Sequence, residues 1–230
     1  MIPGSGTTQE AALTDDWLSR TNRDAVYYAA LRERYSAGKP LWLTETGETA
    51  CGGDPWASDF IDSFRYLNQL GTLAKRGVEV VMHNTLNASD YGLIDESTMT
   101  PRPNYWSAVL WRRLMGTTVL DPGNAPQQPG LYLYAHCLRD HKGGTAILAI
   151  NADRTTAHEI VFPTAYEQYT LTANNLLDST VMLNGTELKL TPNGDLPPIE
   201  GSQHKAGTVT LNPISITFFA VPATNNRACR

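Results

Sequence analysis

One carboxylate in this sequence is placed where chemistry is often found. Glu45 ends the apolar run Leu41-Trp42-Leu43-Thr44, and glycines follow it at positions 47, 52 and 53. A carboxylate at the end of a buried strand and beside a glycine-rich loop is suited to nucleophilic or proton-transfer work, as at the C-terminal ends of barrel strands. A structural role, in which Glu45 caps the loop or pairs with an arginine, explains the same spacing. The spacing alone leaves both roles open.

The composition limits the classes of protein that this chain can represent. Its 230 residues are 41% hydrophobic and 18% charged, which is typical of a globular protein of one or two domains. The net charge of −5 argues against nucleic acid as the main partner, because neutralising phosphates requires clustered Lys and Arg. No apolar run approaches the roughly 18 residues of a membrane span, so none is expected. The first residues lack the features of a signal peptide.

The first half of the chain alternates helical and strand patterns. Apolar spacing predicts a helix over residues 14–36 with Thr14 as N-cap, and a strand over Leu41–Thr44. A second helix is predicted to be capped by Ser58 and to run to Gly77, followed by a strand over Val78–Met82. A third helix is predicted over residues 104–115. This alternation indicates parallel strands joined by crossover helices.

The pattern changes near residue 117. Short alternating segments separated by turn residues then dominate, which is typical of an antiparallel β-sandwich. The predicted strands are residues 131–137, 145–151, 158–162, 168–173, 181–183, 187–191 and 214–222. Three cysteines permit one disulfide and one free thiol. Because there is no CxxC spacing and the histidines are scattered, we expect neither a metal site nor a cofactor.

A series of short segments resembles one known family. Trp42-Leu43-Thr44-Glu45-Thr46 and the Gly52-Gly53 loop are similar to heparanase and its bacterial β-glucuronidase relatives, a family-79-like group of retaining glycoside hydrolases. Further similar segments follow in the family's order from about residue 14 onward, namely 64–71, 77–82, 91–96, 103–106, 114–117, 181–185 and 196–198. The resemblance therefore covers nearly the whole chain.

The resemblance implies a fold of two parts. Residues 1–116 would be the C-terminal part of a (β/α)8 TIM barrel, with Glu45 as the nucleophile at the end of its seventh strand, and residues 117–230 would be the β-sandwich. A retaining mechanism requires a second carboxyl group about 5–5.5 Å away. In the family this acid/base glutamate follows an asparagine on the fourth strand, and this chain contains no Asn-Glu dipeptide. The second carboxylate is therefore expected in a missing N-terminal half of the barrel, and no turnover is expected from this chain alone.

The resemblance also implies a set of substrate contacts. Tyr91 matches the tyrosine that holds the uronate carboxylate, and Asp90 stands beside it where the family often has glycine. An acidic side chain facing an anionic sugar would repel it, so either Asp90 points away or the specificity differs. His83 and Asn84 follow the last barrel strand, where site residues are found. The glycines at positions 52 and 53 are expected to offer backbone N–H donors, although simple turn geometry explains them too.

Cys137 and Cys229 match the family's disulfide, which ties a sandwich strand to the C-terminal segment. A disulfide would indicate an oxidising compartment, and we expect a secreted, periplasmic or extracellular protein. Cys51 has no family counterpart and is expected to be a free thiol. Two buried thiols at 137 and 229 remain the alternative.

Two functional hypotheses follow. In the first, the chain is the C-terminal portion of a retaining hydrolase that cleaves a glucuronate-containing oligo- or polysaccharide, in an exo or endo manner. In the second, it is a catalytically incomplete fragment that binds a glycan or a partner. A hydrolase acting on a neutral or differently configured sugar is a third possibility, which Asp90 makes worth testing.

Overall fold

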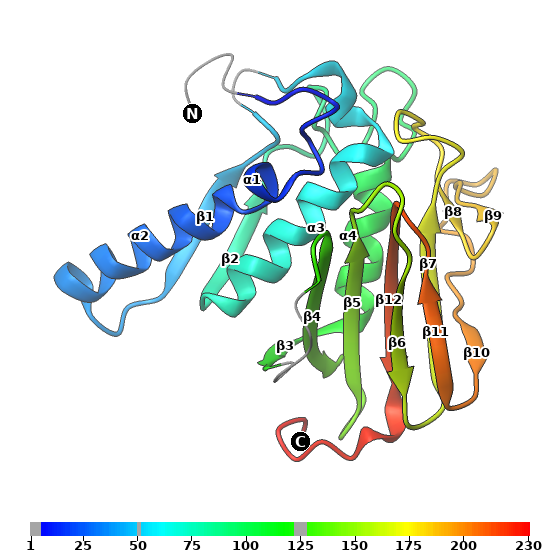
Figure 1. The fold of residues 1–230 in the computed structure, drawn as a ribbon. Helices are drawn as coiled ribbons and strands as arrows, with labels where there is room; N and C mark the ends of the chain where they lie inside the picture. The colour runs from blue at the N-terminus through cyan, green and yellow to red at the C-terminus, as the bar shows by residue number, and fades with distance from the viewer. Residues whose placement is uncertain (1–5, 50–51, 122–127) are drawn as a thin grey trace.

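The computed structural model describes residues 6–49, 52–121 and 128–230. Cys51, predicted to be a free thiol, lies outside the described residues. Figure 1 shows a helical part packed against one face of a large antiparallel sheet, with α2 extending away from the rest of the molecule.

The first part contains the predicted alternation of helices and strands. Strands β1 and β2 pair in parallel, with Leu41 opposite Val78 and Thr46 opposite His83, so the prediction of parallel strands with a crossover helix is confirmed. The elements are α1 (Asp15–Leu18), α2 (Arg20–Ser36), β1 (Leu41–Thr46), the 3-10 helix η1 (Pro55–Ser58), α3 (Phe60–Lys75), β2 (Val78–His83) and α4 (Pro103–Leu114).

The helix ends differ from the sequence prediction in two places. Thr14 caps α1 as expected, since its side chain accepts from the backbone N–H of Trp17, but the predicted helix divides at Ser19 into α1 and α2. The prediction that Ser58 caps the second helix is wrong. Pro55, at the first position of η1, starts a separate turn that includes Ser58, and the N-cap of α3 is Asp59.

Helix α3 is the centre of the helical part. Its apolar residues Phe60, Phe64 and Leu67 are almost completely buried, as their spacing predicts. Gly71 on the same helix lets the Tyr134 ring of the sheet approach closely, since a Cβ at Gly71 would lie 2.3 Å from Tyr134 Cγ. The Tyr134 hydroxyl hydrogen-bonds to both Asn68 and Thr72 of α3. These contacts bind the helix to the sheet.

Within the described residues, eight strands form one antiparallel sheet in the order β3-β4-β5-β12-β7-β8-β9, with β10 also paired to β7 (Figure 1). Strands β3, β10 and β11 were not predicted, and of the predicted strands in this part only β5 and β6 have the predicted limits. The strands are β3 (Met115–Leu120), β4 (Leu131–Leu138), β5 (Thr145–Asn151), β6 (His158–Phe162), β7 (Tyr166–Thr172), β8 (Met182–Leu183), β9 (Thr186–Glu187), β10 (Ser202–His204), β11 (Gly207–Leu211) and β12 (Ser215–Val221).

The sheet has different partners on its two faces. On β12, Ile216, Phe218 and Ala220 belong to the core shared with the helices, whereas Phe219 and Val221 pack under β6 and β11. All seven residues of β12 are therefore buried. The second layer is a two-stranded ribbon of β6 and β11 and not a full second sheet, so the predicted β-sandwich is not confirmed as such.

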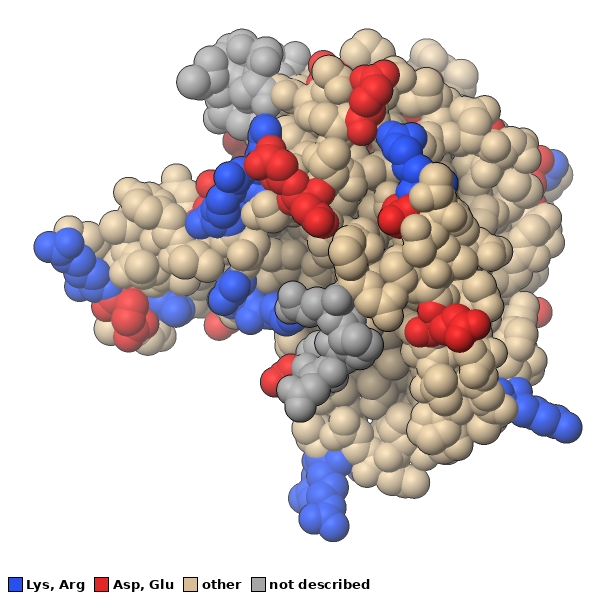
Figure 2. All heavy atoms as spheres, viewed as in Figure 1, with Lys and Arg blue, Asp and Glu red and all other residues tan. Residues whose placement is uncertain are grey.

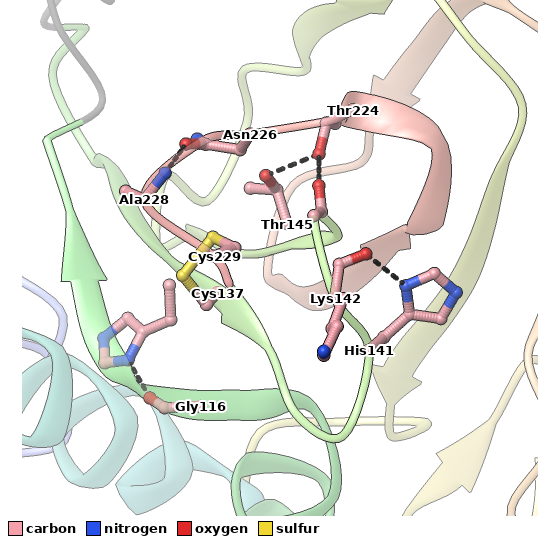
Figure 3. The surroundings of a disulfide bond; sticks show 11 residues. Gly116, Cys137, His141, Lys142, Thr145, Thr224, Asn226, Ala228 and Cys229 are labelled. Carbon is pink, nitrogen blue, oxygen red and sulfur yellow. Dashed lines mark hydrogen bonds between the residues drawn. A yellow bond between two sulfur atoms is a disulfide. The ribbon is translucent and has the colours of Figure 1, made fainter.

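The structure pairs Cys137 of β4 with Cys229 in a disulfide, with the two Cα atoms 5.2 Å apart (Figure 3). The segment around Cys229 is also held by hydrogen bonds, because Thr224 contacts both Thr145 and the carbonyl of Gly143. The predicted pairing is confirmed.

Charged residues of both signs are interspersed on the face that Figure 2 shows. In the part of the chain that the structure describes, no helix combines the length and apolar character needed to cross a membrane.

Candidate active site

Two residues from neighbouring strand ends meet at the candidate site. The exposed carboxylate of Glu45, near the C-terminal end of β1, accepts a hydrogen bond from the Asn84 side-chain amide, with 3.0 Å between Oε1 and Nδ2. The Asn84 backbone N–H donates to the carbonyl of Thr46 at 2.7 Å. Glu45 and Asn84, both predicted site residues, are 39 positions apart in the sequence, and the parallel pairing of β1 with β2 brings them together.

Glu45 also lines a hollow of about 610 Å³ beside the edge of β1. Helix α2 forms one wall, with Ala25 and Tyr28, and α3 forms the floor, with Arg65 and Gln69. The hollow is apolar around Leu41 and Leu43 and polar near Glu45. An exposed carboxylate at the polar end of such a hollow has the surroundings of a nucleophile or a base.

Strand β1 was predicted to be a buried strand, and this prediction is wrong because its residues are partly or fully exposed. Leu41 and Leu43 pack toward the helices, but Trp42 is 53% exposed, and Met82 of β2 is exposed as well. Among the described residues, β1 and β2 pair only with each other. Each therefore leaves one edge of backbone donors and acceptors without a strand partner.

His83 and Tyr91 contact each other directly. The His83 Nε2 atom lies 2.6 Å from the Tyr91 carbonyl oxygen and donates its proton to that oxygen. His83 is the last residue of β2, and its burial lowers the pKa of the imidazole. A neutral imidazole that donates its only proton to a backbone carbonyl holds the Tyr91 segment in place, so His83 makes a structural contact here.

Tyr91 is mostly buried, with only 7% of its surface exposed. Gly47 and Gly53 lie so close to its ring that an added Cβ atom would be 3.1 and 2.7 Å from Cδ1. Gly52 and Asp90 are joined by a backbone hydrogen bond in which the Gly52 carbonyl accepts from the Asp90 N–H at 3.0 Å. The structure thus gives Gly52 an acceptor role toward Asp90, in addition to the donor role that the resemblance implies.

Arg102, which the sequence analysis did not single out, organises the segment that carries Asp90 and Tyr91. Its Nη1 atom donates to the carbonyl of Ser89 and, at 2.9 Å, to that of Asp90. Its Nη2 atom donates to Asp95 Oδ2 at 3.0 Å. Arg102 immediately precedes Pro103 of α4, and an arginine before Pro-Asn carries no recognisable signal for such a role.

A buried polar network lies beneath the strand ends. Asp62 accepts from Arg65 Nε at 2.6 Å and Nη2 at 2.8 Å, and Arg65 Nη1 donates to Gln69 Oε1 at 3.3 Å. Gln69 Oε1 also accepts from the Thr46 hydroxyl at 3.2 Å, which connects the network to the residue after Glu45. Asn104 of α4 donates to Asp62 at 2.7 Å. The sequence alone marks Asp62 only as an acidic residue in the first turn of a helix.

Glu48 is a second carboxyl group close to Glu45 in sequence, and it is 2% exposed. Its burial raises its pKa to about 7, against a hydrogen bond from the Asp54 backbone N–H that favours the ionised form. Glu48 lines the same hollow as Glu45. Nothing in its spacing distinguishes it from an ordinary loop glutamate, so the sequence analysis did not select it.

Comparison of folds finds similar architectures in solved structures of glycoside hydrolases. A 4-O-α-L-rhamnosyl-β-D-glucuronidase of Fusarium oxysporum matches with a TM-score of 0.68 at 14% identity, over 94% of this chain and 50% of that one. A GH51 arabinofuranosidase of Xanthomonas axonopodis matches with a TM-score of 0.62 at 16% identity, over 94% of this chain and 48% of that one. At these identities the comparison shows the fold alone, and the architecture is compatible with part of a TIM-type barrel with an attached sheet.

Sequence comparison defines the family. The chain is 32% identical to heparanase-like protein 1 of Arabidopsis thaliana, over 82% of this chain and 42% of that protein. It is 36% identical to baicalin-β-D-glucuronidase of Scutellaria baicalensis, over 79% and 36%, and 31% identical to the hyaluronoglucuronidase of Hirudo nipponia, over 91% and 48%. The chain belongs to the heparanase and β-glucuronidase family of glycoside hydrolases. It spans less than half the length of these relatives, and no family model matches it.

Proposed function

We propose that this chain is the C-terminal portion of a retaining hydrolase of β-glucuronides, in which Glu45 attacks the anomeric carbon. The observation that carries the proposal is the exposed Glu45 carboxylate at the end of β1, oriented by the Asn84 amide. A nucleophile must be ionised and accessible, and a hydrogen bond that fixes one oxygen orients the other for attack. The named activities of the β-glucuronidase relatives support a glucuronide as substrate.

The acid/base carboxyl group is supplied by residues outside this chain. Asp24 and Glu48 line the hollow together with Glu45. Glu48 is buried and accepts a backbone hydrogen bond, which does not suit proton donation to a leaving group. The unpaired edges of β1 and β2 and the exposed Trp42 and Met82 are suited to strands of an N-terminal half-barrel, which would cover both.

The uronate carboxylate is the second element of recognition. Tyr91 and the neighbouring backbone would hold it, next to His83 at the end of β2. Arg102 and Gly52 hold the Asp90 backbone. The orientation of the Asp90 side chain would then decide whether its charge repels an anionic sugar. The net charge of −5 favours exo action, or action on a weakly sulfated chain, over cleavage of a heavily sulfated polymer.

A non-catalytic role is the second candidate. The chain is 31% identical to inactive heparanase-2 of Homo sapiens, over 85% of this chain and 37% of that protein. A fragment with a glycan-binding or partner-binding role would retain binding without Glu45 chemistry. The disulfide of Cys137 with Cys229 supports a secreted or extracytoplasmic location under either proposal.

Covalent labelling separates the two candidates. The chain is produced together with the preceding half of its barrel and treated with a glucuronate-configured epoxide or activated fluoro-glucuronide, and the modified peptide is sequenced by mass spectrometry. We expect one label, on Glu45, and none in Glu45→Gln, whereas the matched control Glu79→Gln, on the exposed side of β2, labels like the wild type. Labelling of another carboxylate contradicts the assignment of Glu45. Glycan binding that is the same in Glu45→Gln, with no labelling, supports the non-catalytic role.

A further inference from the structure

Two glycines bring the backbone into unusually close contact with the Tyr91 ring. A Cβ atom at Gly47 would lie 3.1 Å from Tyr91 Cδ1 and Cε1, and one at Gly53 would lie 2.7 Å from Cδ1. Gly53 also has a φ of +86°, which side-chain-bearing residues rarely adopt. The position of the ring therefore depends on the positions of both glycines.

One hydrogen bond joins the two segments that carry these glycines. Glu48 directly follows Gly47, and Asp54 directly follows Gly53. The Asp54 backbone N–H donates to Glu48 Oε2 at 3.0 Å. The Glu48 carboxyl group thus closes the two segments around Tyr91.

We propose that Glu48 is a positioning residue that keeps Gly47 and Gly53 against the Tyr91 ring, and that it does so as a neutral carboxyl group. The inference rests on the proposed function, since Tyr91 is the proposed contact of the uronate carboxylate. Ionisation of Glu48 then releases the ring and weakens binding of the anionic sugar.

The surroundings of Glu48 explain why the neutral form fits. Its second oxygen, Oε1, is buried, and among the described residues it has no hydrogen-bond partner. The charged groups that face Glu48 are Asp54 on the adjoining segment and Asp62 and Arg65 on α3. The two hydrogen bonds between Arg65 and Asp62 direct most of the guanidinium toward Asp62. An ionised Glu48 would still be offered the Asp54 N–H, but it would place a buried charge whose Oε1 has no partner next to two other carboxylates. The charged group is therefore expected to turn toward water and give up the hydrogen bond that joins the two segments.

The Tyr91 ring also lies near the titratable side chain of His83, with 6.3 Å between the ring centroids. Burial lowers the pKa of His83 below its usual 6.5, whereas burial raises the pKa of Glu48 to about 7. The two ionisations are therefore separated along the pH scale, and a Glu48 variant removes only one of them.

A tyrosine-labelled NMR titration of the 230-residue chain tests the inference without requiring turnover. The ring signal of Tyr91, labelled with ¹³C and assigned with Tyr91→Phe, is followed from pH 5 to pH 8.5. We expect a transition with a midpoint near pH 7 in the wild type and in the control Glu79→Gln. The transition is lost in Glu48→Gln and in Glu48→Met, which removes the titrating group at similar side-chain length. A transition near pH 7 that persists unchanged in a folded Glu48 variant overturns the inference.

The kinetic test uses the complete enzyme and an aryl β-glucuronide. We expect the KM of the wild type to rise about tenfold between pH 6 and pH 8, because a group with a pKa near 7 is about nine-tenths ionised at pH 8. The rise in KM is expected to be less than twofold in Glu48→Gln. Equal rises in both enzymes contradict the inference. Absence of turnover in the wild type contradicts the proposed function, and the NMR titration then still decides the role of Glu48.

Discussion

Arg65 and Asp62, three residues apart on α3, form a two-bond ion pair with Nε–Oδ1 and Nη2–Oδ2 distances of 2.6 and 2.8 Å, and Asp62 is fully buried. Such a pair stabilises the fold only while both partners are present, because either charge alone would be buried without compensation. The pair joins α3 to α4 through Asn104 and to β1 through Gln69.

Removing one member of this pair is expected to be severely destabilising. We expect Asp62→Ala to lower the free energy of unfolding by about 3–5 kcal/mol, since it leaves the Arg65 guanidinium buried and unpaired. The double variant Asp62→Leu/Arg65→Met is expected to be clearly more stable than Asp62→Ala. Urea denaturation of the three proteins measures the difference, and a double variant no more stable than the single one would contradict this account.

The disulfide is expected to stabilise the chain mainly by restricting its unfolded state. Cys137 and Cys229 are separated by 92 positions, and the chain-entropy relation for such a loop gives about 4–5 kcal/mol. Reduction, or the variant Cys137→Ser/Cys229→Ser, should therefore lower the midpoint of thermal unfolding. Intact mass of the unreduced, alkylated protein checks the bond itself, and alkylation of both Cys137 and Cys229 would show that it does not form.

Glu48 is expected to make stability depend on pH between about 4.5 and 7. Its pKa in the folded chain is raised from 4.5 to about 7, so its stabilising contribution is complete below pH 4.5 and is lost as the pH rises through 7. From pH 4.5 to pH 8, the wild type should therefore lose about 2 kcal/mol of unfolding free energy relative to Glu48→Gln. This value follows from about 1.4 kcal/mol for each unit by which the pKa is raised, reduced because solvent screens part of the charge. Urea denaturation of both proteins at several pH values measures this change. A difference that stays constant with pH would be inconsistent with a buried carboxyl group of raised pKa. Because His83 is present in both proteins, its opposite dependence cancels in the comparison.

Gly71 offers a test of the contact between α3 and the sheet. Glycine to alanine within a helix usually stabilises by about 0.5–1 kcal/mol. Here we expect Gly71→Ala to destabilise by about 1–3 kcal/mol, because the new Cβ would meet the Tyr134 ring, which Thr72 and Asn68 hold in place. In a Tyr134→Ala background the same substitution should become neutral or stabilising. A double-mutant cycle measured by thermal unfolding checks this sign change.

Regular elements were predictable where one local rule dominates. The spacing of Phe60, Phe64 and Leu67 predicted the buried face of α3, and the alternation in residues 145–151 and 158–162 predicted β5 and β6 with their observed limits. Strand β10 has only polar residues and exists through its pairing with β7, so its own sequence carries no strand pattern. The cap at Ser58 was mistaken because Pro55 starts a separate helical turn, which the capping pattern alone does not reveal.

The candidate site divides in a similar way. Glu45 and Asn84 follow strand-like runs, and parallel pairing is sufficient to bring them together. The side-chain partners of Arg65 lie three and four positions away on α3, a helical spacing that the sequence shows, but the burial of the group depends on the tertiary fold. Glu48 and Arg102 likewise depend on burial and on contacts between loop segments, which no local pattern encodes.

The central strand of the sheet has a consequence for synthesis of the protein. Strand β12 lies between β5 and β7, and its residues Ser215 and Val221 pair with Asn151 and Thr145 of a strand made much earlier. While the ribosome is still adding the intervening residues, β5 and β7 lack the neighbour that separates them, and their apolar faces remain accessible to chaperones or to other nascent chains. Productive assembly of this half of the molecule therefore waits for translation to pass residue 221.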